Sequence, residues 1–82
     1  MKTTMLNTAL KKIGAALSDL RQKKGYNSIK EFAEDHDLSL IQYWRIEKGK
    51  ANVTIRSLYR ILAIHKLTVE EFFCQIYKEN KK

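Results

Sequence analysis

Residues that interrupt helices are scarce in this sequence, which has no proline and three glycines among 82 residues. Proline and glycine are the strongest local breakers of regular structure, so long stretches can stay helical. Long hydrophobic runs are missing too. Nothing approaches the roughly 20 apolar residues of a membrane span, and the N-terminus lacks the apolar stretch of a signal peptide. We therefore expect a cytoplasmic protein without a membrane segment.

Cysteine is equally scarce. Cys74 is the single cysteine, so it can form no internal disulfide and has no companions for a metal site, which suits a reducing compartment. No set of nucleophile, base and orienting residues can be picked out, and no glycine-rich phosphate loop is present. The sequence therefore predicts no enzyme, no metal, no cofactor and no small-molecule ligand. Its length fits one domain over 1–82, with a core at about 8–77.

Acidic residues are also a minority, with nine against sixteen lysines and arginines, which gives a formal net charge of +7. The excess is uneven along the chain. Residues 1–24 hold six basic and one acidic residue (+5), residues 28–37 one and four (−3), and residues 39–60 five and one (+4). A basic surface of this kind attracts polyanions, either nucleic acid or an anionic membrane. A basic protein with no such partner is the plain alternative.

Apolar residues recur every three or four positions in five segments, and no segment alternates for long as a strand would. The sequence therefore predicts an all-α fold, a compact five-helix bundle. The first three helices are expected at about 8–24, 28–37 and 39–48, and two more begin at Thr54 and Thr68. The residues before the first helix and the tail 78–82 are expected to fray.

Hydroxyl side chains mark the helix starts, and the second and fifth helices also carry a glutamate at capping-box spacing. Gly25 and Gly49 are expected to end the first and third helices. The residues at helical spacing that form the expected core are Leu6, Leu10, Ile13, Leu17, Leu20, Ile29, Phe32, Ala33, Tyr43, Ile46, Ile55, Leu58, Ile61, Leu62, Val69 and Phe72, with His36 and His65 partly buried beside them.

The second and third predicted helices are joined by only a few residues, around 37–38. So short a connection makes the third helix cross the second steeply and project its N-terminal half outward, as in a helix-turn-helix. Residues 13–73 resemble the phage-repressor/Cro family (XRE-like), and look most similar to short Bacteroidetes regulators. The stretches that carry the resemblance are IGAALSDLRQKKG, SIKEFAEDHDLSLIQYWRIEKGK and TIRSLYRILAIHKLTVEEFF. The resemblance implies a lambda-repressor-like fold that binds double-stranded DNA.

In this family the first, second and sixth residues of the third helix face the major groove, which here are Leu40, Ile41 and Arg45. An arginine can donate two hydrogen bonds to guanine, worth roughly 1–3 kcal/mol of discrimination. The two apolar residues depart from the usual polar ones, yet they can contact thymine methyl groups. Gln42 could read adenine or reach a phosphate. Packing of Leu40 and Ile41 against a partner chain, and a solvated Arg45, remain open alternatives.

Contacts to the DNA backbone fix register without reading sequence. They are expected at the start of the second helix, because a helix start attracts anions, although the family usually has glutamine where Ile29 stands. They are also expected in the turn after the third helix and at the start of the fourth. The candidates are Ser28, Ile29, Trp44, Lys48, Lys50, Asn52, Thr54 and Arg56. Trp44 as a packing residue and the lysines as plain surface residues are the alternatives.

The family also pairs an arginine late in the first helix with the glutamate that precedes the glycine after the third, which implies an ion pair between Arg21 and Glu47. The fifth segment carries more apolar residues than one short helix needs. Phe73, Ile76 and Tyr77 are therefore candidates for homodimer contact, with core packing as the alternative.

The favoured function is a bacterial transcriptional regulator that binds double-stranded DNA sequence-specifically at the nucleoid, as a repressor that occludes a promoter. A homodimer would place two recognition helices one turn of DNA apart on a palindromic operator. A protein-interaction module or an antitoxin with the same fold is the alternative. DNA binding weakens steeply with salt, whereas an apolar protein interface barely responds. RNA is disfavoured because the aromatic residues form no strand-borne stacking platform.

Overall fold

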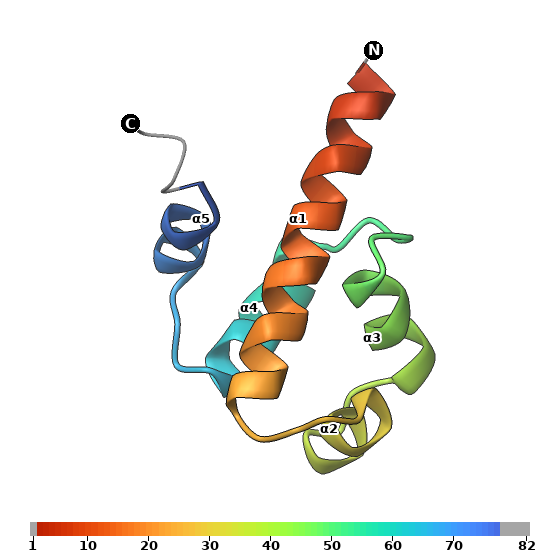
Figure 1. Cartoon of the computed structure of the whole chain (residues 1–82), viewed down its shortest axis with the longest axis vertical. Helices are drawn as coiled ribbons and strands as arrows, with labels where there is room; N and C mark the ends of the chain where they lie inside the picture. Colours follow the sequence, from red (N-terminus) through yellow and green to blue (C-terminus); the bar gives the residue numbers. More distant parts are fainter. Residues whose placement is uncertain (1, 78–82) are drawn as a thin grey trace. The chain divides into compact units, whose positions relative to one another are not determined.

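The computed structural model describes residues 2–77, and their side chains from residue 4 onward. This described part is all-helical, without strands (Figure 1). The predicted all-α fold is confirmed, and the predicted frayed tail 78–82 lies outside the described residues. The five helices are α1 (Lys2–Lys23), α2 (Ile29–Asp35), α3 (Leu40–Glu47), α4 (Ile55–Ile64) and α5 (Val69–Tyr77).

The chain divides into two compact units, residues 1–52 and residues 53–82. The first unit contains α1, α2 and α3, and the second contains α4 and α5. A single domain over 1–82 stays a prediction. Within residues 2–77, no helix combines the length and apolarity needed to cross a bilayer.

Helix α1 begins at Lys2, so the expected start near Thr8 was wrong. Thr8 was expected at the start because the apolar spacing of this segment begins near it. In the structure its hydroxyl donates to the Thr4 carbonyl oxygen at 3.0 Å, which satisfies the side chain inside the helix. Nothing between Lys2 and Gly14 breaks helical structure, so α1 extends back to Lys2.

The first four helices end in the same way, with a residue in the left-handed region that turns the chain. These residues are Gly25, Asp37, Gly49 and Lys66, with φ values of 103°, 58°, 71° and 59°. In each case the amide of this residue and the amide of the residue after it donate back to carbonyls in the last turns of the helix. After α2, for example, the Leu38 amide donates to the Ala33 carbonyl at 2.8 Å and the Asp37 amide to the Glu34 carbonyl at 3.3 Å. This Schellman motif satisfies carbonyls that would otherwise lack partners.

In the first unit, an aromatic cluster packs α2 against α3. The Phe32 and Tyr43 rings lie 5.1 Å apart, and both side chains are buried. His36 is half-buried as expected, and its Nδ1 lies 3.0 Å from the Phe32 carbonyl oxygen. The buried hydrophobic residues of this unit are Leu10, Ile13, Leu17, Phe32, Ala33 and Tyr43.

In the second unit, Thr54 caps α4 by accepting from the Ser57 amide at 3.0 Å. Before α5, Thr68 and Glu71 form the predicted capping box, each side chain bonded to the other's amide at 3.0 and 2.9 Å. The buried hydrophobic residues of this unit are Leu58, Ile61, Leu62 and Phe72.

Two residues expected in the core are exposed instead. Leu6 is 49% and Ile55 is 61% exposed. Both lie near the start of a helix. Ile55 is the first residue of α4, and because helical side chains lean toward the N-terminus, its side chain points past the end of the helix. Leu6 lies in the second turn of α1, where it lines an open groove.

Candidate nucleic-acid interface

The front of α3 is exposed although it is apolar. Ser39 caps the helix, and its hydroxyl accepts a hydrogen bond from the Gln42 amide at 3.4 Å. Ile41 is 70% exposed, Leu40 is 39% exposed, and Gln42 is exposed as well. Burial of apolar surface against a partner is energetically favourable, so this end of α3 offers a contact surface.

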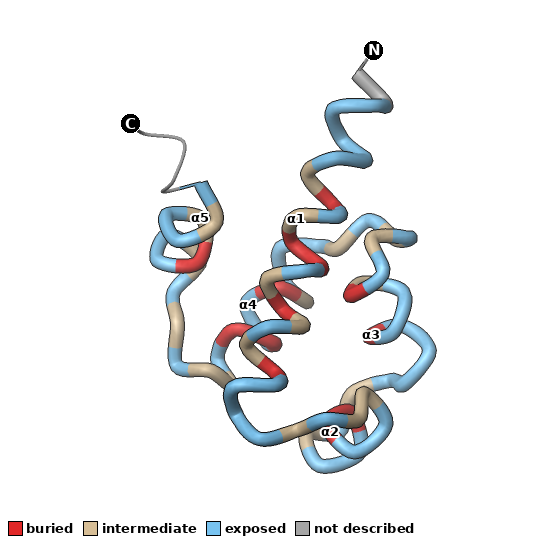
Figure 2. Tube along the Cα trace, viewed as in Figure 1, coloured by how far each residue is buried: buried red, intermediate tan, exposed pale blue. Residues whose placement is uncertain are grey.

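The back of α3 is buried and holds the helix in place. Tyr43 and Glu47 lie one turn apart on this face, and the Tyr43 hydroxyl donates to Glu47 Oε2. Figure 2 shows the buried points of α3 on the side toward α1, while most of its length is exposed. Burial first, and then the bond to Glu47, raises the pKa of Tyr43 above its ordinary value of 10.0. The phenol therefore keeps its proton and remains a donor.

The Arg21–Glu47 ion pair, which the family resemblance implied, is present between α1 and α3. Arg21 Nε donates to Glu47 Oε2 at 2.7 Å and Nη2 to Oε1 at 3.3 Å. Arg21 Nη1 also donates to the Tyr26 carbonyl at 2.8 Å. The two residues are 5% and 8% exposed, and the bond to Glu47 raises the pKa of Arg21. Because the pair is bidentate and buried, it fixes the back of α3 against α1.

Gly14 lets α1 and α3 approach at the backbone, and sequence reasoning missed it. A Cβ built on Gly14 would lie 2.7 Å from the Ile46 carbonyl oxygen and 2.8 Å from the Glu47 carbonyl carbon. No real side chain tolerates backbone atoms that close. The available signal was a glycine inside a helical pattern, which lowers helix stability and therefore often has a packing reason.

Cations gather at the end of α3. Arg45 is exposed, and its Nη2 donates to the Lys50 carbonyl oxygen at 3.4 Å. The Lys48 amine lies 6.0 Å from the centroid of the Trp44 ring, which is 42% exposed. Lys48 and Lys50 are exposed too, so the predicted base-reading arginine and two predicted phosphate contacts share the end of one helix. Their roles toward DNA stay predictions.

The other predicted backbone contacts of the first unit lie on different elements. Asn52 is exposed after α3, while Ser28 and Ile29 are half-buried at the start of α2. Ser28 accepts from the Glu31 amide at 3.2 Å, so its oxygen already caps α2 and its hydroxyl proton remains for another acceptor.

The remaining predicted residues belong to the second unit. Thr54 and Arg56 are exposed at the start of α4. On α5, Phe73 and Ile76 are half-buried and Tyr77 is 37% exposed, with the Phe73 and Tyr77 rings stacked at 6.5 Å. Their contact with a second copy stays a prediction. Among the described residues, no three His, Cys, Asp or Glu side chains come together as a metal site would require.

Helices α2 and α3, packed together through the turn at Asp37, define the class of this chain as a helix-turn-helix protein. Over 68 residues the chain is 38% identical to Control protein C.MunI from Mycoplasma sp, which covers 83% of this chain and 92% of the relative. The chain therefore belongs to the helix-turn-helix regulator family of this control protein. No protein-family model matches the chain, and no solved structure matches it significantly. The expected similarity to Bacteroidetes regulators stays a prediction.

Proposed function

We propose that this protein is a transcriptional regulator, a repressor, that binds double-stranded DNA and reads the major groove with α3. The observation that carries the proposal is the division of α3 into two faces. Tyr43 and Glu47 fix its back, while Leu40, Ile41 and Arg45 stay exposed at its front. The +7 net charge favours a polyanionic partner, and the relative's name as a control protein supports a regulatory role.

In this proposal each exposed residue of α3 makes a different contact with DNA. Arg45 donates to guanine, Leu40 and Ile41 contact thymine methyl groups, and Gln42 reads adenine or reaches a phosphate. The backbone contacts come from Ser28, Ile29, Trp44, Lys48, Lys50, Asn52, Thr54 and Arg56. A homodimer that contacts through Phe73, Ile76 and Tyr77 would bind a palindromic operator.

The test is selection of bound duplexes from a random pool, with the mass of the protein–DNA complex measured on the selected site. We expect a symmetric consensus, a complex of two chains per duplex, and affinity that falls steeply between about 50 and 200 mM salt. Failure to bind any duplex at low salt would remove the proposal.

A protein-interaction module or antitoxin is the second candidate, and the 70% exposure of Ile41 favours it. An exposed apolar side chain of this kind packs against an apolar protein surface as well as against a thymine methyl group. Salt separates the two, because an apolar protein interface responds little to ionic strength whereas phosphate contacts release counterions.

Arg45→Ala should remove most of the preference for the selected operator while leaving the fold intact. The side chain is exposed and makes one long hydrogen bond, to the Lys50 carbonyl, so stability should barely change. We expect the ratio of specific to non-specific affinity to fall by about 1–3 kcal/mol, or roughly 5- to 150-fold. Competition binding with the operator and an unrelated duplex measures this ratio. An unchanged ratio would mean that Arg45 reads no base.

Lys50→Ala should instead weaken binding to all duplexes by about the same factor. A lysine that contacts a phosphate adds affinity without reading sequence, so its loss lowers the salt slope by roughly one. Titrations of operator and unrelated duplexes at several salt concentrations give both quantities. A loss confined to the operator would make Lys50 a base-reading residue.

A further inference from the structure

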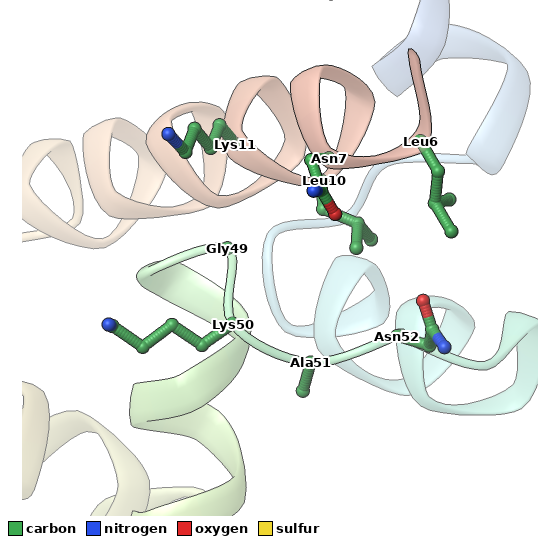
Figure 3. Close-up of a pocket in the computed structure, with 8 residues that line it drawn as sticks. All are labelled: Leu6, Asn7, Leu10, Lys11, Gly49, Lys50, Ala51 and Asn52. Carbon is green, nitrogen blue, oxygen red and sulfur yellow. The ribbon is translucent and has the colours of Figure 1, made fainter. Parts of the chain in front are cut away.

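We propose that a groove between α1 and the segment after α3 extends the DNA contact to α1, with Lys11 and Lys50 holding a phosphate at its mouth. This inference rests on the proposed DNA-binding function and adds a residue, Lys11, that the sequence did not indicate. The groove belongs wholly to the first unit. Its walls are formed by α1 around Asn7 and Lys11, and by residues 49–52 (Figure 3).

Gly49 brings the two walls together. It has a φ of 71°, and a Cβ built on it would lie 3.0 Å from both the Lys11 Cα and the Lys11 Cγ. The turn after α3 therefore rests directly on the Lys11 backbone. Figure 3 shows the Lys11 and Lys50 side chains running toward the same side of the groove, from segments 39 positions apart in the sequence. Tertiary contact thus places two cations beside the end of α3.

The chemistry of the groove fits the backbone of DNA. Its lining carries two lysines and no acidic residue, with Asn7 and Asn52 as hydrogen-bond donors and Leu6 and Leu10 as apolar wall. Within the described chain, neither Lys11 nor Lys50 forms an ion pair. The groove has a volume of about 430 Å³ and is open to solvent, so a sugar–phosphate unit has room to enter it. Amines and amides would face phosphate oxygens while the leucines meet the sugar.

The position of the groove connects it to the proposed base-reading surface. Lys50 follows α3 by three residues, and its carbonyl oxygen accepts from Arg45 Nη2. A DNA strand whose bases are read by α3 therefore passes the end of that helix, where Lys48 and Lys50 are exposed. Lys11 continues this cationic path onto α1. Helix α1 is thus a further DNA-contacting element of the first unit, beside α2 and α3.

The test compares Lys11→Gln, Lys50→Gln and a matched control, Lys23→Gln, which removes the same charge from the same helix. Lys23 lies 12 residues further along α1, about 18 Å away at 1.5 Å per residue and beyond the Debye length near 8 Å. Its amine is already paired with Asp19 at 3.2 Å. Affinity is measured for the operator and for an unrelated duplex across a salt series, with helicity checked by circular dichroism.

We expect Lys11→Gln to lower the salt slope by about 0.9 on both duplexes, so that the wild type's advantage shrinks about 3.5-fold between about 50 and 200 mM salt. Lys50→Gln should lower the salt slope by a similar amount, and Lys23→Gln should keep the wild-type slope. Lys11→Arg retains the positive charge and should also keep the wild-type slope. Neutral methylphosphonates placed one at a time should reveal a position that weakens the wild type more than it weakens either Lys11→Gln or Lys50→Gln.

Three results would overturn the inference. If Lys11→Gln keeps the wild-type slope while Lys50→Gln lowers it, the groove holds no phosphate and the proposed DNA binding stands. If Lys23→Gln lowers the slope as much as Lys11→Gln, the effect is one of net charge alone. If the wild type binds no duplex at low salt, the proposed function itself fails, and the groove's occupant is a different class of molecule.

Discussion

Gly14→Ala should destabilise the protein by about 3 kcal/mol or more, although helix propensity alone predicts the opposite sign. Alanine is better than glycine inside a helix by roughly 1 kcal/mol. At this position, however, the added Cβ would meet the backbone of α3, 2.7 Å from the Ile46 carbonyl oxygen. Backbone atoms cannot rotate away as a flexible side chain can, so α1 and α3 must separate. Urea unfolding followed by circular dichroism measures the loss.

The sign of the effect decides between packing and propensity, and Ala15→Gly is the matched control. Ala15 is the next residue of α1 and is exposed, so the reverse change there should cost only about 1 kcal/mol of propensity. Most small domains have 5–15 kcal/mol in total, so a loss of 3 kcal/mol is a large share of stability. A more stable Gly14→Ala variant would show that the two helices do not touch at this point.

The helices could be predicted from the sequence because their signals are local. Ser39 and Thr54 cap α3 and α4 as expected, and the box of Thr68 and Glu71 opens α5. A cap needs only the three residues that follow it, and apolar spacing needs only one helix. The start of α1 could not be placed, because Thr8 can cap a helix or bond inside one and the sequence does not distinguish these roles.

The left-handed turns after α2 and α4 could not be predicted, because non-glycine residues form them. The turns at Gly25 and Gly49 were predictable because glycine favours the left-handed region. Asp37 and Lys66 adopt the same conformation, with φ values of 58° and 59°. Asp tolerates this region because its short polar side chain can bond locally, whereas lysine carries no such signal. Their turns are imposed by the amides that close onto the helix before them, which is a property of the folded chain.

The candidate interface could be predicted in part. The inward face of α3 was predicted from helical spacing, whereas its groove-facing positions and the ion pair of Arg21 with Glu47 followed from the family resemblance. Gly14 and Lys11 could not be found in this way. Each matters only because residues more than 30 positions away come to lie against it, at Ile46 and Glu47 for Gly14 and at Gly49 for Lys11. Periodicity within one helix carries no information on which residue of another helix lies opposite.

The Glu47→Ala variant should lose about 3–5 kcal/mol of unfolding free energy, because it leaves the Arg21 guanidinium buried without its counter-charge. Arg21 and Glu47 are 5% and 8% exposed, so the guanidinium would be left largely shielded from bulk water. The Tyr43 hydroxyl loses its acceptor at the same time. Denaturant titration measures the loss, and a cost below about 1 kcal/mol would show that the pair is solvated.

The double variant Arg21→Met with Glu47→Leu separates the cost of an unpaired charge from the value of the ion pair. Replacing both partners by apolar residues of similar volume is often neutral or stabilising, so most of the loss in Glu47→Ala should be regained. Because the pair lies beside the Gly14 contact, the double variant also tests what orients α3. If it recovers stability but binds the operator more weakly than the wild type, the pair's role is to hold the front of α3 at the correct angle for the groove. Equal affinity would assign that role to the backbone contact at Gly14.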